Sequence, residues 1–145
     1  MNKKIIWGLI CFLGMGCATL EQNSADWIPI GPEFPPTKVK DIQIISGKAD
    51  VSRPYGNLGL LRIKNVKPQR DSLLMAVEKG KKIAASKGAD AIQIGQYNSA
   101  QDGASEPQVT LIIYAIKYVD QLTPADEKAI EDFKVLGILN ERSDN

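Results

Sequence analysis

The chain predicts an α+β fold: a mostly antiparallel four-stranded sheet in the order strand–strand–helix–strand–strand, followed by an additional C-terminal helix. Apolar and polar residues alternate in four segments, which is the period of a strand with one buried face. Between the second and third segments, apolar residues recur at steps of three and four, as on one face of a helix. A helix-start signal follows the fourth segment. We therefore expect one α+β domain over residues 39–119 and a C-terminal helix with a polar tail over residues 120–145.

The predicted strands cover residues 39–45, 58–66, 91–97 and 108–118. The last of them is apolar on both faces, so we expect it in the middle of the sheet. Gly56 and Gly59, near the start of the second strand, indicate a bulge or a close backbone approach. A strand rather than a helix follows them, which argues against a nucleotide-binding loop. Residues 98–107 are predicted to be a loop.

The first predicted helix begins at a cap on Asp71 or Ser72 and runs to about Lys87. Gly80 is costly inside a helix, so we expect it to bring the helix close to the sheet. Gly88 provides the left-handed residue that ends the helix. The predicted inner face consists of Leu73, Ala76, Val77, Gly80, Ile83 and Ala84.

The second predicted helix begins at Thr123, with Pro124 at its first position and acidic residues in its first turn. Its predicted inner stripe consists of Ile130, Phe133, Leu136 and Gly137. We expect this helix to cover an edge or the remaining face of the sheet. Residues 140–145 form a polar tail.

A basic head and a short apolar run precede a cysteine at the N-terminus. Lys3 and Lys4 lead into about a dozen mostly apolar residues, too few to span a bilayer, which takes roughly 20. This pattern is typical of a secretory signal peptide. The sequence therefore predicts a signal peptide over residues 1–16.

The end of this segment, Gly14-Met15-Gly16-Cys17, resembles the lipobox of bacterial lipoproteins. Gly16 and Cys17 fit the family pattern, which prefers Leu where Gly14 stands. The resemblance implies that Cys17 is acylated, for example with palmitate, and becomes the mature N-terminus. Because Ala18 follows, it also implies sorting to the outer membrane, facing the periplasm or the surface. A signal peptide cut elsewhere and an uncleaved N-terminal anchor are the alternatives.

Residues 17–38 are predicted to be the lipidated N-terminus and a Pro-rich tether. We expect its apolar residues to fix the tether to the domain edge. The alternative is a peptide that docks on another envelope protein or enters lipid headgroups. These apolar residues are Trp27, Ile28, Ile30 and Phe34.

Charge and composition narrow the function classes. Loss of residues 1–16 would leave 16 basic side chains against 17 acidic ones, and this near-neutral balance argues against nucleic acid as a partner. The chain has no histidine, which removes the usual general base and His-containing metal sites. Cys11 would leave with the signal peptide and Cys17 would carry lipid, so no disulfide is expected. The sequence therefore predicts no catalytic residue, no cofactor and no metal site.

The segment from Ala84 to Ile94, AASKGADAIQI, resembles the helix-to-strand junction of small bacterial envelope lipoproteins of the YbjQ-like and Rcs stress-sensor types. The resemblance extends in element order over residues 39–118 and implies a shared architecture, with no functional residue carried over. From the residues alone, Asp90 is expected to accept backbone N–H donors at the turn rather than to catalyse. The tyrosines are expected in the core or at an interface, with a ligand groove as the alternative. They are Tyr55, Tyr97, Tyr114 and Tyr118.

We expect a lipid-anchored cell-envelope protein that acts as a non-catalytic interaction or sensor module. Its expected partners are the membrane, through the N-terminal lipid at Cys17, and another envelope protein. Such a module is expected to expose an apolar patch near Trp27 to Phe34 or on a helix. The alternative is a small-ligand-binding periplasmic lipoprotein, which needs a concave pocket. An enzyme that relies on carboxylates or a Ser–Lys pair ranks last.

Overall fold

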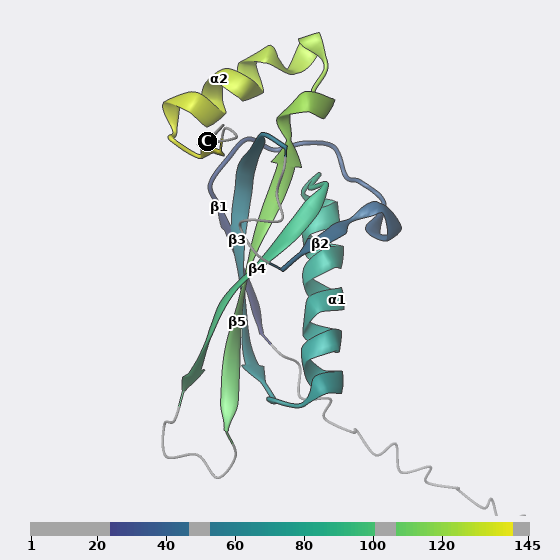
Figure 1. Cartoon of the computed structure of the whole chain (residues 1–145), viewed down its shortest axis with the longest axis vertical. Coiled ribbons are helices and arrows are strands. Elements are labelled where there is room, and N and C mark those ends of the chain that lie inside the picture. The colour runs from purple at the N-terminus through teal and green to yellow at the C-terminus, as the bar shows by residue number, and fades with distance from the viewer. Residues whose placement is uncertain (1–23, 47–52, 101–106, 141–145) are drawn as a thin grey trace, which may run out of the picture.

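The structure is a computed structural model that describes residues 24–46, 53–100 and 107–140. It is an α+β fold, in which a mixed, mostly antiparallel sheet of six strands carries two α-helices. The strand order is β1-β3-β5-β4-β2, and β6 pairs with β3 beyond the end of β1. Figure 1 shows α1 along one face of the sheet and α2 across one end of it.

The strands are β1 (Ala25–Pro29), β2 (Gln43–Ile45), β3 (Tyr55–Val66), β4 (Ala91–Ala100), β5 (Gln108–Tyr118) and β6 (Leu139–Asn140). The α-helices are α1 (Arg70–Ser86) and α2 (Glu127–Val135), and short 3-10 turns cover Val39–Asp41, Val119–Gln121 and Pro124–Asp126. The predicted order strand–strand–helix–strand–strand is confirmed as β2, β3, α1, β4 and β5. The expected number of four strands is wrong, because β1 and β6 extend the sheet.

The predicted tether contains the edge strand β1. Its residues pair antiparallel with β3, from Ala25 opposite Ile63 to Pro29 opposite Gly59. An edge strand tolerates proline because its outer N–H groups need no partner in the ladder. Trp27 and Phe34 pack against the core, as expected for residues that fix this segment to the domain. The folded part therefore begins well before residue 39.

The first predicted strand, residues 39–45, is mostly not a strand. Val39–Asp41 forms a 3-10 turn, and only Gln43–Ile45 pairs with β4, in parallel. Ile42 is buried but Ile44 is exposed at the sheet edge, so the two do not share a buried face. The preceding turn explains the short strand, since a 3-10 turn is incompatible with a ladder over residues 39–41.

The other strands follow the sequence pattern more closely. β5 matches its predicted bounds and lies at the centre of the sheet, between β3 and β4. β4 continues to Ala100, so the predicted loop over residues 98–107 is too long by three residues at its start. Of its remaining residues, 101–106 lie outside the described part of the chain, and Pro107 directly precedes β5.

Helix α1 begins at Arg70, with Gln69 rather than Asp71 or Ser72 as its N-cap. Its predicted inner face is confirmed, with Ala76, Gly80 and Ala84 buried against the sheet. A Cβ atom on Gly80 would lie 2.4 Å from Cδ1 of Ile113, which confirms the close approach to the sheet. Gly88 has a φ of +81°, as predicted for the residue that ends the helix.

Gly56 and Gly59 in β3 lie at a bulge and at close approaches, as predicted. The pairing of β3 with β5 shifts register between Asn57 and Gly59. A Cβ atom on Gly56 would lie 2.4 Å from the ring of Phe133, and one on Gly59 would lie 2.3 Å from the indole of Trp27. These two glycines therefore admit the aromatic side chains that fasten α2 and β1.

Helix α2 covers one end of the sheet rather than an edge or the remaining face (Figure 1). Its start is confirmed by a capping box between Thr123 and Asp126, although the first turn, Pro124–Asp126, is 3-10. Phe133 is fully buried, as predicted, whereas Leu136 is exposed. The predicted stripe is wrong at Leu136 because the helix already ends at Val135. Gly137, with a φ of +65°, then turns the chain into β6.

Candidate functional site

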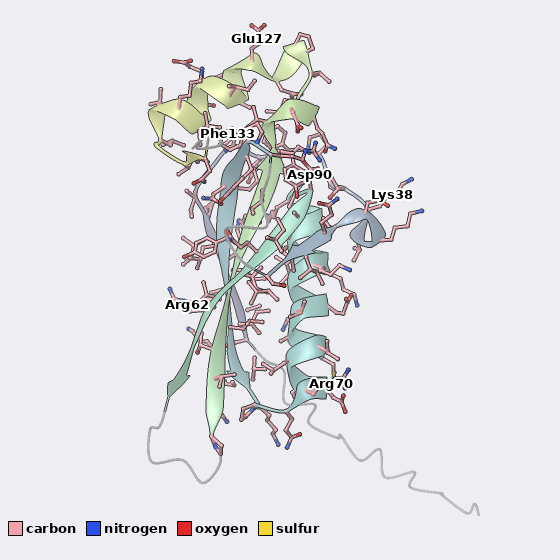
Figure 2. The ribbon with its side chains drawn as sticks, in the orientation of Figure 1. Lys38, Arg62, Arg70, Asp90, Glu127 and Phe133 are labelled. Carbon is pink, nitrogen blue, oxygen red and sulfur yellow. The ribbon has the colours of Figure 1, made fainter. Side chains whose placement is uncertain are left out.

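A hollow of about 410 Å³ opens beside the junction between α1 and β4. Its walls come from the segment after β1, from β2, from the junction and from the end of β5. The polar side chains on these walls are Thr37, Lys38, Asp41, Gln43, Asp90 and Tyr118, and Gln121 lies at the rim. Figure 2 shows Lys38 and Asp90 on this side of the molecule.

Asp90 organises the inner wall of the hollow. One carboxylate oxygen accepts a hydrogen bond from Nζ of Lys117 at 2.9 Å, and the other accepts one from the backbone N–H of Tyr118 at 3.0 Å. Both charged side chains are only 14 % exposed. The ammonium of Lys117 also donates to the carbonyl of Gly88 at 3.2 Å. Asp90 thus accepts a backbone N–H as predicted, but the donor is Tyr118 on β5 rather than a residue of the turn, and Lys117 is a second partner.

Thr37 fixes the outer wall to the junction. Its hydroxyl donates to the carbonyl of Ala89 at 2.6 Å, and its backbone N–H donates to the carbonyl of Ala85 at 2.9 Å. A Cβ atom on Gly88 would lie 2.5 Å from Cβ of Phe34, so glycine is needed here for space as well as for its positive φ. The segment around Phe34 and Thr37 is thus held against the end of α1.

Tyr118 lies between the hollow and a surface ion pair. Its hydroxyl donates to Oε1 of Gln43 at 2.8 Å, and the guanidinium of Arg53 lies 4.2 Å from the centre of its ring. Arg53 in turn donates two hydrogen bonds to Asp120, at 2.8 and 2.6 Å. Bidentate pairs of this kind fix the guanidinium in one orientation. The stacked arginine therefore holds the tyrosine ring in place.

Three groups around Tyr118 have shifted pKa values. Burial raises the pKa of the Tyr118 phenol above its ordinary value of 10.0, and the nearby Arg53 opposes this rise. The hydrogen bonds between Arg53 and Asp120 raise the pKa of the guanidinium and lower that of the carboxyl group. Near neutral pH the phenol is therefore a neutral donor, and the surface pair is fully charged.

An aromatic contact links the hollow to α2. The ammonium of Lys117 lies 5.3 Å from the centre of the Phe34 ring, and that ring stacks on Phe133 at 6.3 Å between centroids. Phe133 is the buried anchor of α2. The hollow and α2 thus belong to one end of the molecule, which we call the α2 pole.

Four polar side chains on the walls of the hollow, Thr37, Gln43, Asp90 and Tyr118, are already hydrogen-bonded within the protein. The Tyr118 hydroxyl already donates to Gln43 and the Thr37 hydroxyl to Ala89, while the exposed ammonium of Lys38 lies at the rim. Both oxygens of Asp90 already accept hydrogen bonds. Across the described ranges, no group of three or more Cys, Asp or Glu side chains is placed to hold a metal ion.

The structure separates the residues that the sequence analysis singled out. Cys17 lies outside the described residues. Tyr55 and Tyr118 are cross-strand partners in one small apolar cluster, but only Tyr118 lines the hollow. Tyr114 lies on β5 farther along, and nothing is described of the Tyr97 side chain. The tyrosines therefore do not converge on one groove.

Gln43, Arg53 and Lys117 were missed as parts of this site. Their partners lie 75, 67 and 27 residues away in the sequence. The alternation of β5 places Tyr118 correctly on a face, but only the strand pairing shows which residues of β2 and of the junction meet it. One sequence signal was usable: Lys117 is a charged residue within the most apolar strand, which indicates a buried partner.

Exposed apolar side chains gather in two pairs on the helices. Val135 and Leu136 at the end of α2 are 75 % and 54 % exposed. Leu74 and Met75 in the second turn of α1 are 54 % and 70 % exposed. Near Trp27 to Phe34, Ile28 is exposed as well. No helix in the described part of the chain is long and apolar enough to cross a membrane.

The chain matches no protein-family model, and no curated protein matches it. Among solved structures, it is similar to the Francisella virulence factor FvfA, known from an orthorhombic crystal form. The similarity has a TM-score of 0.46 and 20 % sequence identity, and it covers 65 % of this chain and 97 % of that chain. It carries no residue or activity over to this chain. The resemblance to envelope lipoproteins stays a prediction.

Proposed function

We propose that this chain is a lipid-anchored cell-envelope protein that acts as a non-catalytic interaction or sensor module. In this proposal, Cys17 carries the lipid and holds the protein at the outer membrane. The α2 pole binds another envelope protein. The N-terminal sequence supports the proposed location of the protein, and the exposed apolar residues at the end of α2 support the proposed binding surface.

The exposed pair Val135 and Leu136 is the observation that carries the binding part of the proposal. Phe133, two residues earlier, is fully buried and fixes the helix to the sheet. The pair is thus presented by a well-anchored element, so that little conformational entropy is lost when a partner binds. The buried core of a protein–protein interface is more apolar than the rest of the surface, so such a pair can lie in it.

The two carboxylates beside Tyr118, Asp90 and Asp120, are poorly placed for catalysis. A general base needs a lone pair that can reach a substrate proton. Both oxygens of Asp90 are occupied by Lys117 and by the Tyr118 backbone, and the carboxylate of Asp120 is occupied by Arg53. These groups stabilise the α2 pole and shape its surface.

Metabolic labelling with a radioactive fatty acid tests the anchor. The native protein and a Cys11→Ser variant should both be labelled, because Cys11 would leave with the signal peptide. A Cys17→Ala variant should lose the label and leave the membrane fraction. Equal labelling of the Cys17→Ala variant would refute acylation at this residue.

Site-specific photo-crosslinking in intact cells tests the binding surface. A photoreactive residue at Val135 should give a discrete crosslinked species. The same residue at Lys128, an exposed position on the same helix, should give much less. If both positions give equal or no crosslinks, the end of α2 is not a docking surface.

The hollow favours a second candidate function, the binding of a small polar ligand. Its volume of about 410 Å³ lies within the range of small-molecule sites. Native mass spectrometry of protein isolated from its own envelope should then reveal a bound small molecule. A Gln121→Trp variant, which fills the hollow from its exposed rim, should lose that mass while folding normally. Protein that carries no small molecule in either form would exclude this function.

A further inference from the structure

The described chain begins at the end of the molecule opposite α2. The carbonyl of Ser24 accepts a hydrogen bond from the N–H of Lys64 at 2.9 Å, close to the end of β3 at Val66. Helix α1 starts at Arg70, only a few residues later. Figure 2 shows Arg70 at the far end of the molecule from Phe133. We call this end, with Ser24, residues 64–69 and the first two turns of α1, the tether pole.

The tether pole carries the second exposed apolar pair. In the second turn of α1, Leu73 and Ala76 pack toward the sheet, while Leu74 and Met75 point away from it and are 54 % and 70 % exposed. Arg70 lies one turn earlier and is also exposed.

Charges of both signs surround this pair. Arg70 precedes Leu74 by one helical turn, and the acids Asp71 and Glu78 lie one turn before and one turn after the pair. Lys64 is paired with Asp26 at 2.7 Å. An exposed apolar pair with a long basic side chain one turn away can enter the interface of a lipid bilayer while the cation stays at the phosphates.

The length of chain between Cys17 and Ser24 sets the distance between this pole and a lipid at Cys17. These seven residues reach at most about 25 Å when fully extended. The twelve residues of β3 span about 40 Å. A lipid at Cys17 therefore keeps the tether pole within about 25 Å of the bilayer, whereas the α2 pole can lie a strand length farther away.

We propose that Leu74 and Met75 dock the tether pole on the lipid surface. This inference rests on the proposed acylation of Cys17, which brings the pole to the membrane but does not orient it. Docking at α1 stands the molecule on the bilayer and directs Val135, Leu136 and the hollow away from it. The two exposed apolar pairs then have different roles: one contacts lipid and the other contacts protein.

Depth-dependent fluorescence quenching tests the docking. The full acylated protein is labelled at a Gln69→Cys substitution and reconstituted in vesicles of phosphatidylethanolamine and phosphatidylglycerol that contain nitroxide lipids. Gln69 is exposed and makes no side-chain cap bond, so the label should not disturb α1. A label at a Lys128→Cys substitution on α2 serves as the distal reference. We expect several-fold stronger quenching at residue 69 than at residue 128.

The matched variants are Met75→Glu and Val135→Glu, which place a charge at similarly exposed sites on opposite poles. Met75→Glu should reduce the quenching at residue 69 several-fold, and Val135→Glu should leave it unchanged. Equal quenching at residues 69 and 128, or no effect of Met75→Glu, would overturn the docking. Mass spectrometry of the same samples reports the lipid on Cys17. An unacylated Cys17 would refute the proposed anchor, whereas an acylated protein without selective quenching would refute only the docking.

Discussion

At the scale of single residues, the α2 pole depends on close contacts that leave no room for larger side chains. Phe133 is fully buried, and its ring occupies the space above Gly56 and Gly31. The same ring stacks on Phe34, which lies under the ammonium of Lys117. A substitution at any of these positions is therefore expected to alter the packing of α2 and the shape of the hollow.

Gly56→Ala should destabilise the protein, because the added Cβ would lie 2.4 Å from the Phe133 ring. Overpacking of this kind costs about 1–3 kcal/mol in the free energy of unfolding. Urea unfolding followed by circular dichroism measures the loss. The double variant Gly56→Ala with Phe133→Leu should be more stable than the sum of the single effects predicts, because leucine leaves room for the methyl group. Strict additivity would contradict this contact.

Asp90→Asn should also destabilise the protein, by about 2 kcal/mol, because it leaves the half-buried ammonium of Lys117 without its counter-charge. The amide oxygen can still accept from the Tyr118 N–H, so the loss reports mainly on the ion pair. The double variant Asp90→Asn with Lys117→Met should recover part of the stability. Urea midpoints of the four proteins give the coupling energy, and a coupling near zero would show that the pair contributes nothing.

The raised pKa of Tyr118 predicts a specific loss of stability in alkali. In the unfolded chain the phenol ionises near its ordinary value of 10.0, but burial in the folded state raises its pKa above that. Its contribution is thus fully present below pH 10 and is lost as the pH rises through the folded pKa. The urea midpoint of the native protein should fall more steeply above pH 10 than that of Tyr118→Phe. Parallel curves for the two proteins would exclude this contribution.

At the scale of elements, the sequence predicts well where periodicity is strong. The bounds of β5, the inner face of α1 and the start of α2 follow from alternation, helical spacing and capping residues, and the structure confirms them. The two glycines of β3 were predicted as close approaches, although the aromatic residues they admit could not be named. Neighbours within one element or turn were enough for these predictions.

The sequence fails where an element depends on a distant partner. The edge strand β1 contains Asp26 and ends at Pro29, and lacks the alternation of a strand with a buried face. It forms because β3 offers it a ladder and Gly59 offers space for the Trp27 indole. The candidate site could not be predicted for the same reason, because Gln43, Asp90 and Tyr118 meet only through the pairing of β2, β4 and β5. No local pattern contains that pairing.

Trp27→Ala should loosen β1 without unfolding the rest of the sheet. Loss of the half-buried indole over Gly59 should cost about 2–3 kcal/mol, somewhat less than for a fully buried tryptophan. Hydrogen exchange should accelerate at the amide of Lys64, which donates to Ser24. Ile28→Ala, at the exposed neighbouring position, is the control and should change little. Unchanged exchange at Lys64 in Trp27→Ala would show that the indole does not hold β1.

At the scale of the whole molecule, the two poles have different proposed roles: the tether pole contacts lipid and the α2 pole contacts a protein. The chain enters the fold at the tether pole along β1, returns to that pole along β3, and leaves it again along α1 (Figure 1). The α2 pole, with the hollow and the pair Val135 and Leu136, lies at the other end. The sheet is continuous between the poles, which lie about the length of β3 apart.

A longer tether distinguishes anchoring by the lipid from docking by the surface of α1. A flexible Gly/Ser insertion of about 12 residues between Glu21 and Gln22 adds roughly 20 Å of average reach. If Leu74 and Met75 hold the tether pole on the lipid, the insertion should leave the quenching at residue 69 nearly unchanged. In the Met75→Glu background, the same insertion should lower it further, because only the tether then limits the distance. If the insertion alone abolishes the quenching, the length of the tether and not the surface of α1 sets the position of the molecule on the membrane.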